Sequence, residues 1–185
     1  MSIDLPKHLG GHGNISNIDE NLFVSLIDKY NIKNMLDVGC GTLGMVNLAL
    51  QHGIDAYGVD GDFNLLYNEE IKNKERLSIS DFTQSKWKSP IKFDLIWSVE
   101  VAEHIEEQYA KNYIETIADN IKNDGILVFT HANPGQGGYH HVNEQPIMYW
   151  EAKLAQLGLD IIEEEKAFDN QYTVYVFKKK GKYCD

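Results

Sequence analysis

A glycine-rich turn in this sequence could bring the polypeptide backbone close to a nucleotide-like ligand. Residues 39–44 read Gly-Cys-Gly-Thr-Leu-Gly, after an apolar run and before a helical stretch. Glycines at this spacing allow a tight strand-to-helix turn and a close approach of the ligand to the backbone. The spacing alone does not identify that ligand, because many strand–helix turns contain glycines. The residues predicted to form the site here are Gly39, Cys40, Gly41 and Gly44.

Acidic residues around the turn indicate which ligand it would hold. Asp37 lies at the mouth of the turn, where a carboxylate disfavours a pyrophosphate and suits a cationic group. Asp60 ends the next apolar run, about 20 residues later, where an acid can bind ribose hydroxyls. Asp81 and Phe82 end a third run and are placed to hydrogen-bond and stack an adenine. S-adenosylmethionine (SAM), which carries an ammonium and a sulfonium but no phosphate, fits these acids better than NAD.

Two of these acidic positions have a structural alternative. Gly61 and Asp62 follow Asp60 directly, so Asp62 either contacts the same ligand or caps the next helix. Asp81 either binds adenine or is an ordinary strand-end turn residue.

An alternation of short apolar runs and amphipathic stretches positions these residues, and it is typical of a parallel α/β sheet. The predicted strands are residues 35–38, 56–59, 77–80, 93–98, 126–130, 159–165 and 172–178. The predicted helices follow an N-cap at Asp19 and then span residues 45–52, 63–71, 106–121 and 146–157. The last helix before the fifth strand should end at the turn Asn123-Asp124-Gly125. A short polar link makes the last two strands an antiparallel pair.

Length and composition bound the kind of protein this is. The 185 residues suit a single domain over 1–185, and residues 1–17 have no clear period and form either a flexible lid or a tail. No apolar run reaches the roughly 20 residues of a membrane span, and no basic-then-apolar export signal begins the chain. We therefore expect a cytoplasmic protein. Cys40 and Cys184 lie far apart, so no disulfide framework is expected.

The charge of the chain argues against a nucleic-acid partner. The net charge is −11 and Arg76 is the only arginine, whereas phosphate binding needs clustered cations. Lys178, Lys179, Lys180 and Lys182 form a basic tail, which is either the solvated end of an edge strand or a binding patch.

Three motifs resemble those of the class I SAM-dependent methyltransferases, over nearly the whole chain. Met35-Leu36-Asp37-Val38-Gly39-Cys40-Gly41 resembles the first motif of that family, Val59-Asp60 the second, and Phe93-Asp94-Leu95-Ile96 the motif of the fourth strand. The resemblance implies a Rossmann-like α/β fold with SAM as cofactor. Its seven-stranded sheet would be mostly parallel, end in a C-terminal antiparallel hairpin and be flanked by helices. Leu43 departs from the family, in which many members have glycine, and Gly44 is expected to allow the close approach instead.

The segment after the fourth strand is dense in functional groups. In the resembled family such a segment lines the floor beneath the transferable methyl group. The resemblance therefore implies cofactor contacts by Ser98, Val99 and His104, with Glu100 touching the cofactor or the acceptor. The alternative is that Glu103 and His104 merely begin a solvated helix.

A long loop after the fifth strand carries three of the seven histidines. Loops of this length are usually functional or disordered, and this one is rich in imidazole and poor in charge. Catalytic roles are predicted for His140 and His141, with His131 next and Glu100 as a further candidate, because an imidazole can act as a base near neutral pH. Acceptor contacts are predicted for Asn133, Gln136, Tyr139 and Asn143. A purely structural Ω-loop is the alternative.

The same loop allows two further interpretations, a resemblance to a subgroup and a metal site. Its pattern T-H-A-x-P-G-Q-x-G-x-H-H-V-N resembles a subgroup of small methyltransferases without a settled substrate, so the match locates a site without naming a reaction. His131, His140, His141, Glu100 and His12 could also converge on a metal ion. Adjacent histidines commonly point opposite ways, however, and no H-x-x-x-H or paired-cysteine spacing occurs, so no metal is predicted.

The predicted function is methyl transfer from SAM to a small polar acceptor, such as a hydroxyl of a sugar or another metabolite. The negative charge favours a neutral or cationic acceptor, with neither nucleic acid nor membrane as partner. The alternative is a non-catalytic SAM- or nucleotide-binding regulatory module, which the same fold could form. An NAD-dependent oxidoreductase is excluded by Asp37 and by the lack of a second nucleotide-binding half.

Overall fold

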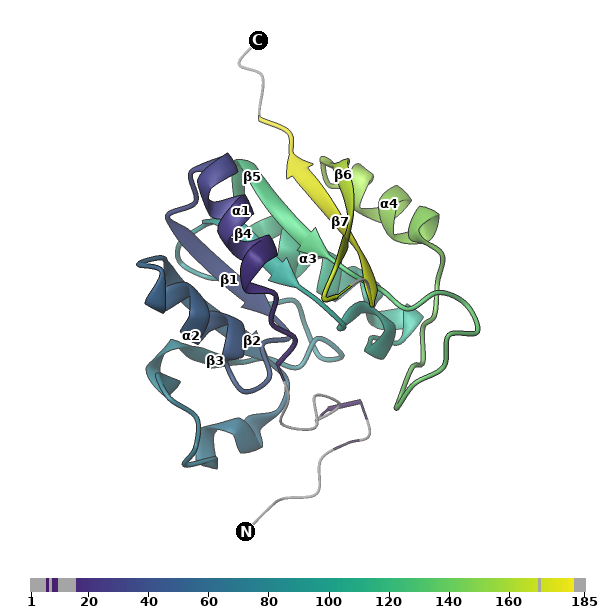
Figure 1. Cartoon of the computed structure of the whole chain (residues 1–185). Coiled ribbons are helices and arrows are strands. Elements are labelled where there is room, and N and C mark those ends of the chain that lie inside the picture. Colours follow the sequence, from purple (N-terminus) through teal and green to yellow (C-terminus); the bar gives the residue numbers. More distant parts are fainter. Residues whose placement is uncertain (1–5, 7, 10–15, 170, 182–185) are drawn as a thin grey trace.

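One sheet of seven strands, in the order β3-β2-β1-β4-β5-β7-β6, lies between two layers of helices in the computed structural model (Figure 1). The structure describes residues 6, 8–9, 16–169 and 171–181. The strands are β1 (Asn34–Val38), β2 (Asp55–Asp60), β3 (Leu77–Ile79), β4 (Phe93–Ser98), β5 (Ile121–Phe129), β6 (Leu159–Ala167) and β7 (Tyr172–Lys179). The helices are α1 (Glu20–Tyr30), α2 (Gly44–Gln51), α3 (Ala110–Asn120) and α4 (Ile147–Gln156).

Strand direction and strand order together create the place for a ligand. Strands β1 to β5 pair in parallel, whereas β7 runs antiparallel to both β5 and β6. The predicted seven-stranded sheet with a C-terminal antiparallel hairpin is therefore confirmed. The chain order reverses between β1 and β4, so the loops after these two strands leave in opposite directions. Open α/β sheets bind ligands at the carboxyl ends of the strands beside such a reversal.

Both faces of the sheet are buried. On β4, Leu95 and Trp97 pack in the core shared with α1 and α2, whereas Ile96 packs in the core shared with α3 and α4. This alternation follows from the period-two geometry of a strand. Because each central strand is covered on both sides, the strands are continuous apolar runs, which made them recognisable in the sequence.

The first helix begins at the predicted N-cap and is tied to the far end of the chain. One Asp19 oxygen accepts from the N–H of Leu22 at 2.9 Å, which satisfies a free donor of the first turn of α1. The other oxygen accepts from the N–H of Phe168 at 2.7 Å, in the link between β6 and β7. A single carboxylate therefore fixes α1 against the C-terminal hairpin.

Two predicted helices are shorter than the sequence pattern indicated. The helix predicted over residues 63–71 is only a 3₁₀ helix, Phe63–Tyr67, because the Asn68 side chain accepts from the N–H of Glu70 at 3.0 Å and turns the chain. The helix predicted over residues 106–121 is a 3₁₀ turn, Glu107–Tyr109, followed by α3.

The predicted turn at residues 123–125 lies within β5 rather than before it. Ile121 already pairs with Phe93, and the next partners along the ladder are Leu95 and Ile126. The residues between them bulge out of the sheet, with Asp124 at φ +62°. This bulge carries the turn signal that the sequence shows.

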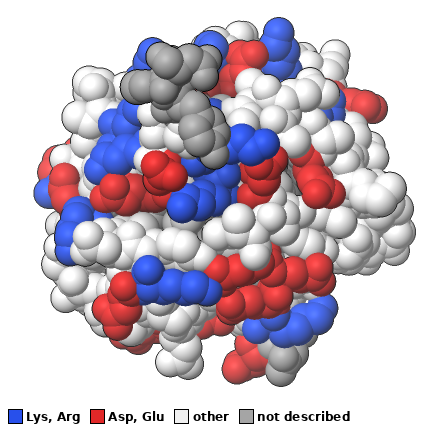
Figure 2. All heavy atoms as spheres, turned by 90° about the horizontal axis from the view of Figure 1, so that it is seen from above, with Lys and Arg blue, Asp and Glu red and all other residues white. Residues whose placement is uncertain are grey.

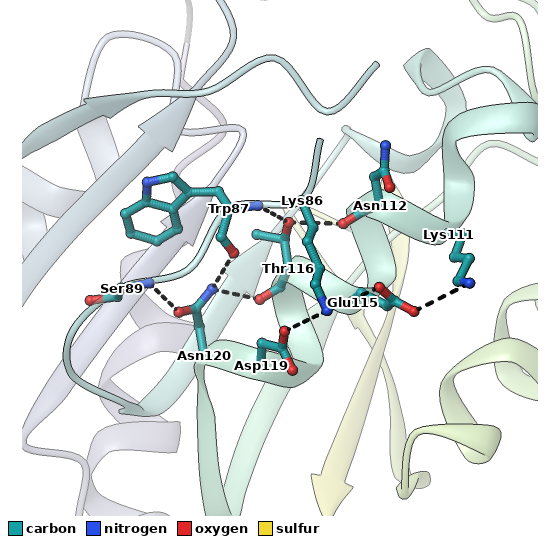
Figure 3. Close-up of polar contacts among 9 residues, drawn as sticks. All are labelled: Lys86, Trp87, Ser89, Lys111, Asn112, Glu115, Thr116, Asp119 and Asn120. Atoms are coloured by element: carbon teal, nitrogen blue, oxygen red, sulfur yellow. Dashed lines mark hydrogen bonds and ion pairs between the residues drawn. The ribbon is translucent and has the colours of Figure 1, made fainter. Parts of the chain in front are cut away.

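The segment between β3 and β4 is held by side chains of α3 rather than by secondary structure of its own (Figure 3). The buried Asn120 side chain accepts from the N–H of Ser89 at 2.7 Å and donates to the carbonyl of Trp87 at 3.1 Å. The Thr116 hydroxyl accepts from the N–H of Trp87 at 3.0 Å. Lys86 adds ion pairs to Glu115 and Asp119. These contacts satisfy a backbone that would otherwise be left without partners.

The lysines of β7 and the residue after it do not form a free basic patch. Lys178 pairs with Asp124 at 3.6 Å, Lys180 pairs with Asp160 at 2.7 Å, and Lys179 donates to the carbonyl of Leu157. Figure 2 shows basic and acidic side chains interspersed on the face of the molecule seen there. Lys182 lies outside the described residues.

Within the described part of the chain, no helix is long and apolar enough to span a membrane.

Leu43 adopts a conformation that usually requires glycine. It lies at φ +65° and ψ +24° as the N-cap of α2, and its side chain is fully buried. A Cβ at Gly58 of β2 would overlap the side chains of Leu43 and Cys40. Many family members have glycine where this chain has Leu43. The absence of a side chain at Gly58, on the neighbouring strand, leaves room here for the leucine.

The positive φ of Leu43 can be tested with two substitutions that remove the same side chain. Leu43→Ala should lower the free energy of unfolding by about 2–5 kcal/mol, because a buried leucine is lost. Leu43→Gly should be about 1 kcal/mol more stable than Leu43→Ala, because glycine adopts the left-handed conformation without strain. Urea unfolding of both variants measures the difference. An alanine variant more stable than the glycine variant would contradict this path of the loop.

Candidate active site

A cavity of about 280 Å³ opens at the carboxyl ends of β1, β2, β3 and β4. It combines acidic, apolar and imidazole side chains. Its lining residues include Asp37, Gly39, Cys40, Asp60, Gly61, Asp81, Phe82, Trp97, Val99, Glu100, Val101 and His104. The structure therefore brings together most of the cofactor-binding residues predicted from the sequence.

The glycine turn forms one wall of the cavity. Asp37, at the end of β1, is only 5% exposed. Gly39 lies at φ +81°, and a Cβ there would overlap the side chain of Val101. Burial, with a further contribution from the charge of Asp60, raises the pKa of Asp37 to about 8. Near neutral pH the side chain of Asp37 is therefore partly or mostly protonated, and a cationic ligand beside it would favour the carboxylate.

Asp60 is held in place by the backbone around it. One of its oxygens accepts from the N–H of Gly41 at 2.8 Å, and the other accepts from the N–H of Asp62 at 2.9 Å. Each oxygen keeps a second lone pair for a hydroxyl donor. Asp62 itself does not line the cavity and caps the next 3₁₀ helix, accepting from the N–H of Asn64 at 2.8 Å. The structure thus gives Asp62 the capping role of its two predicted alternatives.

Two glycines of the turn shape the cavity without lining it. The N–H of Gly41 is taken by Asp60, and the N–H of Gly44 donates to the hydroxyl of Ser16 at 3.1 Å. Ser98 is likewise fully buried away from the cavity. Its hydroxyl donates to the carbonyl of Val38 at 2.9 Å and lies 2.7 Å from the Tyr113 hydroxyl. Ser98 thus joins β4 to β1 and α3.

Asp81 and Phe82 form the opposite end of the cavity. One Asp81 oxygen accepts from the N–H of Thr83 at 2.8 Å, and the other lies 3.1 Å from Nε2 of His8. Burial alone would raise the pKa of Asp81, but the hydrogen bonds from His8 and Thr83 outweigh it and lower that pKa.

Part of the N-terminal segment lies on the cavity. His8 and Leu9 line it, and a Cβ at Gly61 would overlap the Leu9 side chain. The predicted lid or tail over residues 1–17 is described only at residues 6, 8–9 and 16–17, and the remainder, His12 included, lies outside the described residues. No sequence signal singled out the contact between His8 and Asp81.

Glu100 enters the cavity from the end of β4 in a strained backbone conformation, at φ +58°. The Thr130 hydroxyl, at the end of β5, accepts from the N–H of Glu100 at 2.7 Å and donates to its carboxylate at 2.8 Å. Burial raises the pKa of Glu100. One threonine therefore fixes both the backbone and the side chain of this acid.

The residues after Glu100 do not begin a solvated helix, so that alternative is wrong. Glu103, in the 3₁₀ helix Ala102–His104, has no exposed surface. Burial and the charge of Glu100 raise the pKa of Glu103 to about 8. Nδ1 of His104 lies 3.2 Å from the carbonyl oxygen of His140, and burial lowers the pKa of His104. Glu103 therefore belongs to the interior, whereas His104 is half-buried and lines the cavity.

The loop from residue 130 to residue 146 places its three histidines differently. The His141 ring lies 5.1 Å from the His104 ring, edge to face. His140 contributes its carbonyl to His104, and its own Nε2 is buried with no hydrogen-bond partner among the described residues. His131 lies away from the cavity, stacked on Tyr175 of β7 at 5.6 Å. Burial lowers the pKa of His131.

The predicted acceptor residues also divide into two groups. Asn133, Gln136 and Tyr139 are exposed on the loop and do not line the cavity. Asn143 is 3% exposed, and its N–H donates to the carbonyl of Glu103 at 3.0 Å. The neighbouring N–H of Val142 donates to the same carbonyl at 2.9 Å. This end of the loop is therefore fastened to the segment after β4.

Comparison with known proteins decides the family. Residues 16–165 match the family described as a methyltransferase domain. The chain belongs to this family. The prediction of a methyltransferase is thereby confirmed, with SAM as its methyl donor. A search of curated proteins gives no match.

Solved structures similar to the methyltransferase share its fold at low sequence identity. A SAM-dependent methyltransferase from Clostridium acetobutylicum superposes with a TM-score of 0.71 at 16% identity, over 89% of this chain and 94% of its own. The sugar N-methyltransferase KedS8 from Streptoalloteichus gives 0.73 at 14% identity, over 92% and 90%. The N-methyltransferase NodS from Bradyrhizobium japonicum, in complex with S-adenosylhomocysteine, gives 0.68 at 17%, over 88% and 86%.

The cavity of the methyltransferase fits SAM. The buried Asp37 offers a carboxylate to a cationic group, and Asp60 keeps free lone pairs for ribose hydroxyls. Side chains at Gly39 and Gly61 would meet Val101 and Leu9, so glycine keeps the walls thin at both positions. Phe82 supplies an aromatic surface beside Asp81 for an adenine. Asp37, Asp60 and Phe82 thus follow one another in the order of the cationic group, the ribose and the adenine of SAM.

The raised pKa of Asp37 predicts proton release when SAM binds. Below about pH 8 the unliganded Asp37 is mostly protonated, and a nearby cation favours the carboxylate. The affinity for SAM should therefore rise as the pH increases from about 6 to about 8, with close to one proton released per SAM at pH 7. Titration calorimetry in buffers of different ionisation enthalpy measures this release. Asp37→Asn should abolish the release, and equal release by both proteins would contradict the role of Asp37.

Proposed function

We propose that the methyltransferase transfers the methyl group of SAM to a hydroxyl of a small polar acceptor, such as a sugar or another metabolite. SAM supplies an electrophilic methyl group: its bond to sulfur breaks, a methyl–oxygen bond forms, and the hydroxyl proton must leave. The chain therefore has to bind both molecules, exclude water between them and accept one proton.

Glu100 carries this proposal, because it is a carboxylate that lines the same cavity as the predicted SAM residues. Burial raises its pKa toward neutrality, which suits a group that takes up a proton during the reaction. Thr130 holds the carboxylate at a fixed place. Glu100 is thus a better candidate for the base than the three predicted histidines, His131, His140 and His141, none of which lines the cavity.

The loop at residues 131–146 suits recognition of the acceptor at the rim of the cavity. Its anchored end lies against Glu103, whereas Tyr139 is 75% exposed and Asn133 and Gln136 are exposed residues. The amide oxygen of Gln136 accepts from the N–H of Asn133 at 3.1 Å, which leaves its amide nitrogen as a donor. Amide groups can both donate to and accept from hydroxyl groups, as binding of a sugar would require. The net charge of −11 favours a neutral or cationic acceptor. KedS8, which shares the fold, is a sugar N-methyltransferase, so an amine is a second acceptor class worth testing.

Ligand titration tests the first half of this proposal. We expect the protein to bind SAM and S-adenosylhomocysteine in calorimetric titrations and not to bind NAD, because no lysine or arginine is among the described residues that line the cavity and could pair with a pyrophosphate. Asp60→Asn should weaken SAM binding by at least tenfold, and Asp160→Asn, far from the cavity on β6, should leave it unchanged. Binding of NAD without SAM would overturn the proposal.

Substitution of Glu100 tests the second half. After a labelled-methyl screen over hydroxyl- and amine-bearing metabolites has found an acceptor, Glu100→Gln should lower turnover by about 10²-fold or more. The dissociation constant of SAM should change less than threefold, because the amide keeps the shape of the side chain. Glu151→Gln, exposed on α4, is the matched control. Full turnover in Glu100→Gln would remove Glu100 as the base.

A further inference from the structure

A carboxylate behind the cavity is buried without an ion pair to any described residue. Glu103 is 0% exposed. Within the described part of the chain its carboxylate contacts only its own backbone and the carboxylate of Glu100, and neither contact has the geometry of an ordinary hydrogen bond. An ionised carboxylate without a partner is costly to bury, and a second carboxylate, Glu100, lies close by. Such an arrangement needs either a proton or a cation.

Two histidines beside Glu103 are oriented as metal ligands usually are. Nδ1 of His104 lies 3.2 Å from the carbonyl oxygen of His140, and Nδ1 of His141 lies 3.1 Å from a carboxylate oxygen of Glu144. Both partners only accept, so each neutral ring carries its proton on Nδ1 and leaves Nε2 with a free lone pair. Metal-binding histidines characteristically donate their other N–H to a carbonyl or a carboxylate in this way.

The partner groups of these histidines are themselves fixed. Glu144 accepts from the N–H of Gly135 at 2.8 Å and from the N–H of Gly137 at 2.6 Å. A Cβ at Gly138 would overlap the ring of His141, so glycine is required where the loop passes that ring. Hydrogen bonds within the loop therefore hold His141 and Glu144 together, and the bonds of residues 142 and 143 to the carbonyl of Glu103 tie this part of the loop to the third member of the cluster.

We infer that Glu103, His104 and His141 bind a divalent first-row transition-metal ion beside the methyl-transfer cavity. One potential ligand atom from each residue lies within 4.8 Å of the other two, close enough to surround a single ion. Two imidazoles and one carboxylate suit Zn²⁺, Co²⁺, Fe²⁺ or Mn²⁺ better than Mg²⁺ or Ca²⁺, which prefer sets of oxygen ligands. This inference departs from the prediction, made from the sequence, that the chain binds no metal, and it includes two residues, Glu103 and His104, that were not considered there as metal ligands.

The position of the site suggests what the ion would do. His104 and Glu100 line the cavity, whereas Glu103 is buried behind them. Three protein ligands leave at least one coordination position open. On the proposed function, on which this step rests, an acceptor hydroxyl in that position would be polarised by the ion and would lose its proton to Glu100 more readily. The acceptor class is thereby narrowed to molecules with a hydroxyl that can coordinate a metal.

Metal titration of the untagged, chelator-stripped full-length protein tests the inference. We expect one equivalent of Co²⁺ or Zn²⁺ per chain, followed by visible absorption for Co²⁺ and by calorimetry for Zn²⁺, with weaker binding of Mg²⁺ and Ca²⁺. Glu103→Gln and His141→Gln should each lower the affinity by about 100-fold or more. His52→Gln removes a histidine that pairs with Glu20 on the surface, and it should bind like the unmodified protein. Gly138→Ala keeps every ligand but displaces the His141 ring, and it should weaken binding by about tenfold.

Several outcomes would contradict the metal site. The inference fails if Co²⁺ and Zn²⁺ do not saturate the protein, or if Glu103→Gln and His141→Gln bind as tightly as the unmodified chain. Glu103→Gln with unchanged heat stability and unchanged affinity for metal would show that residue 103 is buried as a neutral acid instead. SAM titration of the same samples separates the two proposals. SAM binding without metal binding would overturn only the metal site, and metal binding without SAM binding would overturn only the proposed function.

Discussion

Burial of carboxylates at the ends of the parallel strands is the constraint around which the rest of this molecule is organised. Asp37, Asp60 and Glu103 are all less than 10% exposed, although ionised side chains lose several kcal/mol of hydration when they leave water. The fold answers this constraint differently at each place. Backbone N–H groups surround Asp60, whereas burial raises the pKa of Asp37 and of Glu103. A group that the protein does not satisfy internally is one that a ligand can satisfy.

The order of the strands explains why these carboxylates and the cavity lie together at the carboxyl ends of the strands. The strand order reverses between β1 and β4, so the segments that follow these strands separate and leave space between them. Short, tight connections then carry the polar groups, with glycine at the positions where a side chain would close the cavity. The hydrophobic layers on both sides of the sheet hold this edge rigid, because α1 and α2 cover one face and α3 and α4 the other (Figure 1). Polar chemistry at the edge thus depends on apolar packing behind it.

Much of the fold could be predicted because its signals are local. The run 93–98 is β4 with the same bounds, Asp19 caps α1, and the short link after residue 165 forces an antiparallel hairpin. The failures have non-local causes. Ile121 is a strand residue because it pairs with Phe93, and Glu103 is buried because residues 142 and 143 fold back onto its carbonyl. The stacking of His131 on Tyr175 depends on the position of β7, which no spacing in the loop reveals.

The two bonds made by Asp19 also bear on how the chain acquires its structure. Its oxygens join the start of α1 to Phe168, and 149 positions of sequence separate the two residues. The first helix of the chain therefore completes its anchoring only after the last hairpin has formed. During synthesis from the N-terminus, this contact cannot form before Phe168 has left the ribosome. Closure of so long a loop is slow and favours a single late, cooperative step over stepwise assembly.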